Sequence, residues 1–338
     1  MNRILFLIIT FFLTTNLFAQ TEEDINDWVN KGMAEAIKEN YKEAIPYFEK
    51  AKEEYEKLGK NNKNFGDILS TLSILYSDLG DYKKAIEYET KAMEVTKATL
   101  GVNHPNYANS LTMLAVYYDT LGDDSKVVEY GTKATKLWNE LAGYFSSIGD
   151  YSKALEYGIM AMNTFKIAFG ENHPDYATAL NNIAYYYSNL NDYSKAVEYE
   201  AKAMEIRGTT LGKNHPIYAK TLSILAGYFS HLGDYDKAVE YGMKALEIRK
   251  TVLGENHLDY ATSLSNLADY YSDLGDYAKA VKYRTKALEI REDILGENHL
   301  SYGISLTSIA MEYANLGDYA KAVENASKAM MIYKAAYG

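Results

Sequence analysis

A short phrase recurs along this chain with a fixed 42-residue period. The tripeptide Gly-Asp-Tyr begins at Gly80, Gly233, Gly275 and Gly317, with a degenerate copy at Asn191. A second phrase, Leu-Gly-x-Asn-His, begins at Leu100, Leu211, Leu253 and Leu295, with a near copy at Phe169. A fixed period between about 20 and 50 residues predicts a stack of like structural units. We therefore expect a repeat architecture, in which each unit packs only on its neighbours.

Each unit has the pattern of two amphipathic helices. In residues 175–210, the apolar spacing predicts a first helix that runs to Leu190 and a second helix from Lys195 to about Thr210. Pro174 suits the start of the first helix, and Gly212 lies just past the end of the second. Small side chains seven positions apart on the second helix should let two helices cross closely, and this pair recurs as Ala44/Ala51, Ala85/Ala92, Ala154/Ala161, Ala196/Ala203, Ala238/Ala245, Ala280/Ala287 and Ala322/Ala329.

The period fails at one place. Gly122-Asp123 is followed by Gly149-Asp150 at a 27-residue interval, because the loop and the first turns of the next helix are missing. No proline or turn pair lies within Ser125–Ile148, and its apolar residues keep one helical phase. This favours one helix, about 36 Å long at 1.5 Å per residue. The alternative is a tight turn near Asn139, since asparagine caps helices well.

Residues 1–19 have the pattern of a secretory signal. Arg3 supplies the positive charge, an apolar run follows, and Ala19 offers a cleavage site before Gln20. A membrane anchor is the alternative, but the apolar run is about half of the roughly 20 residues that a spanning helix needs. We therefore expect an exported protein, periplasmic or secreted, with no membrane span after cleavage. The chain has no cysteine, so it lacks the lipid-attachment residue of a bacterial lipoprotein.

Composition and spacing argue against several classes of site. The net charge of −11 and the absence of a basic stripe argue against nucleic-acid binding. Five histidines occupy the same loop position in different repeats, which spreads them too far apart to share a metal ion and favours helix capping: His104, His173, His215, His257 and His299. No motif singles out a nucleophile, an acid–base pair or a phosphate loop. We therefore predict a protein that is not an enzyme and has no metal or cofactor.

The repeat phrase resembles a known family. The matching residues in one unit are Leu225, Ala226, Phe229, Gly233, Asp234, Tyr235, Ala238 and Ala245, and they resemble the tetratricopeptide repeat (TPR). The longer 42-residue period, with the loop Leu211–Pro216, is similar to the kinesin-light-chain subtype. The resemblance covers roughly residues 23–338. It implies an all-α, right-handed superhelical solenoid of seven to eight antiparallel helix pairs.

The resemblance and the break in the period suggest a division of the chain. Residues 1–19 would be the signal peptide, and 20–124 the N-terminal repeats. Residues 125–148 would be an irregular, shortened repeat, and 149–338 the C-terminal repeats. In the family, the first helix of each pair lines a concave groove. A merged helix would interrupt this row and leave a longer C-terminal groove from residue 175 onward.

The family resemblance also implies which side chains line that groove. The expected set is Asn181, Asn182, Tyr185, Asn189, Lys220, Ser223, Ser230, Ser265, Asn266, Asp269 and Asp273. Amides and hydroxyls can hydrogen-bond an extended peptide backbone. Family members that grip chaperone C-terminal carboxylates use Lys, Arg and Asn at set positions, but the key asparagine position here holds Ile74, Val116, Tyr185, Gly227, Asp269 and Met311. A carboxylate clamp is therefore not implied.

These observations predict a scaffold for protein–protein interactions that binds a protein or peptide in its concave groove. The alternative is a sensory or regulatory module whose effector lies beyond residue 338 or on another chain. The chain stops at Gly338, where the next loop would begin, and no polar capping helix follows, although terminal repeats normally need one. An oligomer formed through this uncapped C-terminal repeat is therefore also possible.

Overall fold

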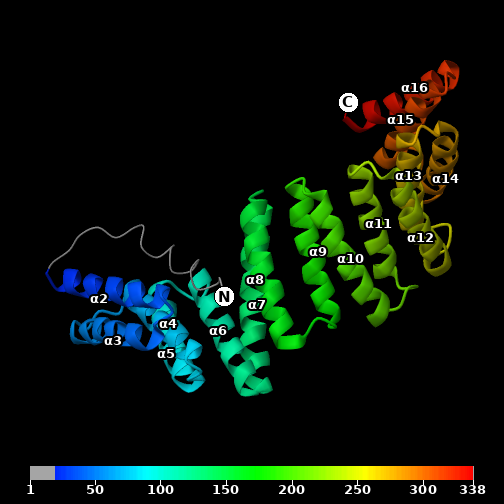
Figure 1. Ribbon diagram of the computed structural model, residues 1–338. Coiled ribbons are helices and arrows are strands. Elements are labelled where there is room, and N and C mark those ends of the chain that lie inside the picture. Colours follow the sequence, from blue (N-terminus) through cyan, green and yellow to red (C-terminus); the bar gives the residue numbers. More distant parts are fainter. Residues whose placement is uncertain (1–19, 338) are drawn as a thin grey trace. The chain divides into compact units, whose positions relative to one another are not determined.

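The computed structural model describes residues 20–337, which contain fifteen α-helices and no strand (Figure 1). The predicted signal sequence lies outside the described residues. The helices are α2 (Gln20–Ile37), α3 (Tyr41–Lys57), α4 (Lys63–Asp78), α5 (Tyr82–Thr99), α6 (Pro105–Leu121), α7 (Asp124–Ser147), α8 (Tyr151–Phe169), α9 (Pro174–Asn189), α10 (Tyr193–Thr210), α11 (Pro216–His231), α12 (Tyr235–Leu253), α13 (Leu258–Asp273), α14 (Tyr277–Leu295), α15 (Leu300–Asn315) and α16 (Tyr319–Tyr337).

The recurring phrases lie at the helix ends. The aspartate of Gly-Asp-Tyr directly precedes the second helix of a pair and caps it. For example, the Asp234 carboxylate accepts a hydrogen bond from the backbone N–H of Lys237. The loop histidine precedes the first helix, and its Nδ1 accepts the backbone N–H two positions on, as in His215 with Ile217 at 3.2 Å. The same contact is made by His104, His173, His257 and His299. The capping interpretation of the histidines is therefore confirmed.

Helices pack against each other in pairs along the chain, so the fold is an all-α solenoid of helix pairs. The pairs are α2–α3, α4–α5, α9–α10, α11–α12, α13–α14 and α15–α16. The second helix of one pair also contacts the first helix of the next, as α12 contacts α13 and α14 contacts α15. The recurring alanines are buried at these crossings, as predicted. Ala238 and Ala245 on α12, for example, have no exposed surface.

The shortened interval is a single helix. α7 runs without a break from Asp124 to Ser147, so the continuous-helix interpretation is confirmed and the turn near Asn139 is wrong. The predicted phase holds through Val127, Ala134 and Leu137, which are buried. It does not extend to Ile148, which lies just beyond the helix end and is exposed. Trp138 anchors the helix by donating its indole N–H to Thr112 Oγ1 of α6 at 3.0 Å.

The chain forms two compact units. Among the described residues, the first contains 20–144 together with Glu156–Gly170, and the second contains Phe145–Leu155 together with 171–337. In the first unit, Phe48, Leu69 and Leu72 are among the most buried core residues. In the second, the core includes Leu264, Leu267 and Tyr270. The residues from α9 onward, which sequence analysis singled out for binding, all lie in the second unit.

Ala245→Leu should destabilise the protein by about 1–3 kcal/mol, because it forces extra methyl groups into a closed crossing. Ala245 has no exposed surface, so the added volume can be accommodated only by displacing neighbours. The measurement is the urea midpoint of unfolding, followed by circular dichroism. Ala326→Leu, on the exposed surface of α16, is the matched control and should leave the midpoint nearly unchanged. Equal midpoints for the two variants would show that the crossing is not closed.

Candidate binding groove

The second unit contains a groove of about 530 Å³ formed by three first helices, α9, α11 and α13. Equivalent positions of these helices are separated by one repeat period in the sequence, so each helix contributes the same stripe to the wall. The residues that line the groove are Asn181, Asn182, Tyr185, Ser188, Lys220, Ser223, Ile224, Gly227, Tyr228, His231, Asn266, Asp269 and Tyr270.

Most of the predicted groove residues are found together in this lining. They are Asn181, Asn182, Tyr185, Lys220, Ser223, Asn266 and Asp269. Asn189 and Asp273 are exposed near the carboxyl ends of α9 and α13 and do not line the groove. The Asn189 amide donates to the Tyr185 carbonyl of its own helix, and Asp273 accepts a hydrogen bond from Ser230 at 3.4 Å.

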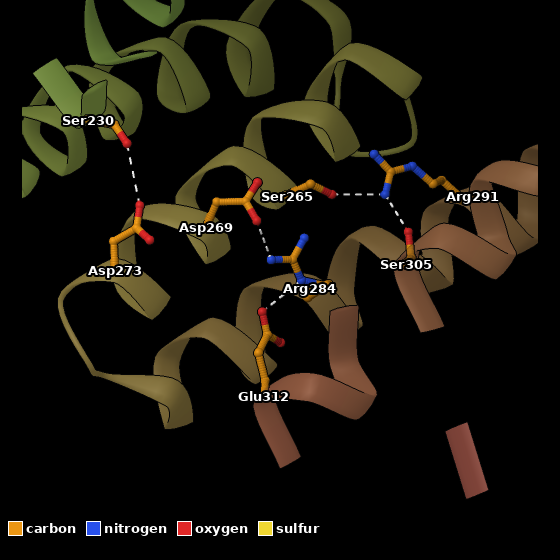
Figure 2. Close-up of polar contacts among 8 residues, drawn as sticks. All are labelled: Ser230, Ser265, Asp269, Asp273, Arg284, Arg291, Ser305 and Glu312. Atoms are coloured by element: carbon orange, nitrogen blue, oxygen red, sulfur yellow. Dashed lines mark hydrogen bonds and ion pairs between the residues drawn. The ribbon is translucent and has the colours of Figure 1, made fainter. Parts of the chain in front are cut away.

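Ser265 corrects the predicted set. Only 8% of this residue is exposed, and its hydroxyl accepts a hydrogen bond from Arg291 Nη1 at 2.8 Å (Figure 2). The same guanidinium nitrogen reaches Ser305 Oγ of α15 at 2.6 Å. Ser265 is thus buried at a contact between repeats, and it is not among the residues that line the groove. One repeat earlier, Arg249 makes the same pair of contacts with Ser223 and Ser263, so these arginines tie each first helix to the next.

Two tyrosines of the lining were missed by sequence analysis. Tyr228 and Tyr270 belong to a series that recurs at the same repeat position, with Tyr117 and Tyr186. Their helical phase marks them as core residues, and burial does raise the pKa of both Tyr228 and Tyr270 to about 12. The recurrence of tyrosine at this position was a signal that could have drawn attention to them. Each forms part of the groove surface between neighbouring first helices.

A buried carboxylate lies behind the α9 wall. Glu200 of α10 has no exposed surface, and its Oε2 accepts a hydrogen bond from Asn181 Nδ2 at 2.6 Å. Arg207 Nη1 lies 3.6 Å from the other carboxylate oxygen. Burial raises the pKa of Glu200. Because its amide nitrogen is held by Glu200, Asn181 is fixed in the orientation that it presents at the groove.

A second buried network fixes the opposite wall. Arg284 of α14 donates from Nε to Glu312 Oε1 at 2.8 Å and from Nη2 to Asp269 Oδ1 at 2.6 Å (Figure 2). The side chains of Arg284 and Glu312 are 7% and 3% exposed, whereas that of Asp269 is 59% exposed. Burial raises the pKa of Glu312. Asp269 is thus the solvent-facing end of a charge network that is otherwise inside the protein.

The side chains of the groove can form hydrogen bonds and ring contacts with a bound molecule. The groove's amides and hydroxyls can both donate and accept hydrogen bonds, and Tyr185 adds a ring that is 47% exposed. Among residues 20–337, no group of three or more His, Asp or Glu side chains is placed to hold a metal ion. Over the same range, no helix is long and apolar enough to cross a membrane.

Comparisons with known proteins identify the repeat. The tetratricopeptide repeat family model matches residues 28–98, 68–140, 135–209, 201–251, 217–293 and 259–335. A crystal structure of a kinesin-light-chain-like protein with nearly identical TPR-like repeats, from Podosopora anserina, is 22% identical, has a TM-score of 0.55 and covers 60% of this chain and 96% of its own. A point variant of that same protein is 23% identical, with a TM-score of 0.54 and coverage of 58% and 93%. No curated protein matches the sequence. The resemblance to kinesin-light-chain-like repeats is confirmed.

Proposed function

This chain belongs to the tetratricopeptide repeat family, and we propose that it is an exported, non-enzymatic scaffold that binds a peptide segment of a partner protein. TPR repeats are suited to protein–protein interaction, because a solenoid presents an extended surface. The observation that carries the proposal is the groove formed by α9, α11 and α13. It is lined by neighbouring repeats, so a partner could contact several of them at once.

Two properties of the groove support a peptide as the bound group. Its polar side chains come mainly from amides and hydroxyls, which match the alternating donors and acceptors of an extended backbone. Its exposed ring, Tyr185, is a flat surface with a hydroxyl, and such residues often dominate binding at interfaces. Asn181 and Asp269 are held by buried partners behind the wall, so these side chains would lose little conformational freedom on binding.

A random heptapeptide library displayed on phage and selected on the purified protein tests this proposal. We expect recovered peptides, resynthesised with a fluorophore, to bind in solution by fluorescence anisotropy. Their binding should weaken when groove residues are changed and persist when residues of the first unit are changed. The proposal fails if selection recovers no binding peptide, or if every recovered peptide binds groove variants as tightly as the parent.

Export is the second part of the proposal, and it rests on the pattern of residues 1–19. The protein should be found outside the cytoplasm, with a mature chain that starts at Gln20 or within a few positions of it. N-terminal sequencing of the recovered protein measures this directly. An intact Met1 on membrane-bound protein would contradict cleavage and favour an anchor.

A further inference from the structure

The groove contains a glycine without a packing reason. Several glycines elsewhere in the helices have one: a Cβ added at Gly131 would lie 2.6 Å from Ala168 Cβ, and one at Gly242 would lie 3.0 Å from Leu267. At Gly303 the added atom would be 3.3 Å from Ile332. At Gly227, inside α11, an added Cβ would have no described atom within 4 Å apart from the neighbouring backbone of its own helix, and the φ angle is not in the left-handed region. Neither crowding nor backbone strain therefore requires glycine there.

Glycine inside a helix is less favourable than alanine, because its backbone loses more conformational freedom on folding. The equivalent positions of the two neighbouring repeats hold Tyr185 and Asp269, which both project side chains into the groove lining. Because Gly227 has no side chain, a hollow is left between a tyrosine on α9 and a carboxylate on α13. Met311 occupies the same position two repeats after Gly227 and is 64% exposed, so a long side chain is compatible with the position.

An exposed carboxylate, Asp269, lies at the position of α13 equivalent to Gly227, whereas the Arg249 guanidinium is already held by Ser223 and Ser263. Asp269, Glu312 and Arg284 together carry two carboxylates and one guanidinium, and of these three only Asp269 is exposed. Arg284 contacts Oδ1 of Asp269, which leaves Oδ2 to face other groups. Asp273 adds a further exposed carboxylate one turn along α13. The lysine of the groove lining, Lys220, lies seven positions before Gly227 on α11, which is about 10 Å along the helix axis.

We propose that the hollow over Gly227 receives a lysine or arginine side chain of the bound peptide, between the Tyr185 ring and the Asp269 carboxylate. This inference rests on the proposed peptide-binding function. An aromatic ring and a carboxylate attract a cation from two sides, through the ring quadrupole and through charge. The protein's net charge of −11 favours approach by a basic segment. A side chain at position 227 would occupy the space that the cation needs.

The experiment uses the phage-displayed heptapeptide library and two matched variants. Gly227→Met fills the hollow, whereas Gly143→Met makes the same change at the equivalent position of α7, which also has open space but does not line the groove. Asp269→Asn removes the charge and keeps the shape. Circular dichroism should show Gly227→Met to be folded and at least as stable as the parent, since it removes a helical glycine.

We expect the selected peptides to be enriched in lysine or arginine. A selected peptide should bind Gly227→Met about tenfold more weakly or worse, bind Asp269→Asn about threefold more weakly, and bind Gly143→Met within about twofold of the parent. Replacing its basic residue with citrulline or norleucine should reproduce the loss.

The possible failures are distinguishable. If the selected peptides bind Tyr185→Ala more weakly than the parent, the groove is the binding site. If those same peptides carry no basic residue, or bind Gly227→Met as tightly as the parent, the present inference is overturned. If no peptide is selected, the proposed function fails and this inference falls with it. Equal losses in Gly227→Met and Gly143→Met would also overturn it, because the effect would then not depend on the hollow.

Discussion

Replacing Arg284 with glycine should destabilise the protein by about 3–5 kcal/mol, because a buried carboxylate loses its cation. Arg284 and Glu312 are nearly inaccessible to solvent, and their Nε–Oε1 distance is 2.8 Å (Figure 2). The second partner, Asp269, is mostly exposed and can be hydrated after the change. Glu312 is buried and cannot be hydrated in this way. Its other oxygen, Oε2, has no hydrogen-bond partner within the part of the chain that the structure describes.

The repeat itself provides the rescue. The positions of Arg284 and Glu312 correspond, one repeat earlier, to Gly242 and Tyr270. That pair is complementary by shape, because a Cβ at Gly242 would lie 3.2 Å from Tyr270 Cε2. Glu312→Tyr alone should also destabilise the protein, since the ring would have to share its space with Arg284. The double variant Arg284→Gly/Glu312→Tyr should recover to within about 1 kcal/mol of the parent, since apolar packing can replace a buried ion pair.

Urea unfolding at pH 7 and pH 5 measures these effects and separates charge from packing. The pKa of Glu312 is raised by burial, so the native state binds this proton more readily than the unfolded state does. Stability linked to Glu312 is therefore present at low pH and lost as the pH rises through the folded pKa. Without Arg284 this dependence should strengthen, so the Arg284→Gly deficit should shrink at pH 5. A deficit that is equal at both pH values, or a double variant no better than the single one, would contradict the assignment.

Most of the architecture could be predicted because it repeats. A turn phrase, a loop phrase and an alanine pair recur at one interval, so each local prediction was supported by several copies. One residue illustrates each case. Asp234 caps a second helix, His215 caps a first helix, and Ala245 is buried at a helix crossing. The merged helix α7 could be predicted for the opposite reason. It lacks turn residues, and its apolar phase continues where the loop is missing.

The departures from the repeat were harder to predict. Helical phase assigns a face to each residue, but it does not say which side chain of the next repeat fills the same space. Ser265 has the phase of a groove residue, yet Arg291 reaches it from α14. Glu312 has the phase of a core tyrosine and is accommodated only because Arg284 replaces a glycine. A pair such as Arg284 and Glu312 can be recognised only when both of its positions are compared with the same two positions of the neighbouring repeat.

Tyr185→Ala and Asn182→Ala should each weaken binding of a selected peptide by more than about 1 kcal/mol, which is roughly fivefold or more. Tyr185 is 47% exposed and Asn182 is exposed as well, so their loss should leave the unfolding midpoint nearly unchanged. The two residues lie about one turn apart on α9 and both line the groove, so one peptide can contact both.

The matched control is the pair Thr71→Ala and Ile74→Ala, at the equivalent positions of α4 in the first unit. These changes should alter peptide affinity by less than about twofold, provided that the variants remain folded by circular dichroism. Anisotropy titrations with one labelled peptide compare all four variants under the same conditions. If the Asn182/Tyr185 double variant binds as tightly as the parent, the groove is not the binding surface. A loss that is equal in the α4 variants would instead indicate an effect that does not depend on the groove formed by α9, α11 and α13.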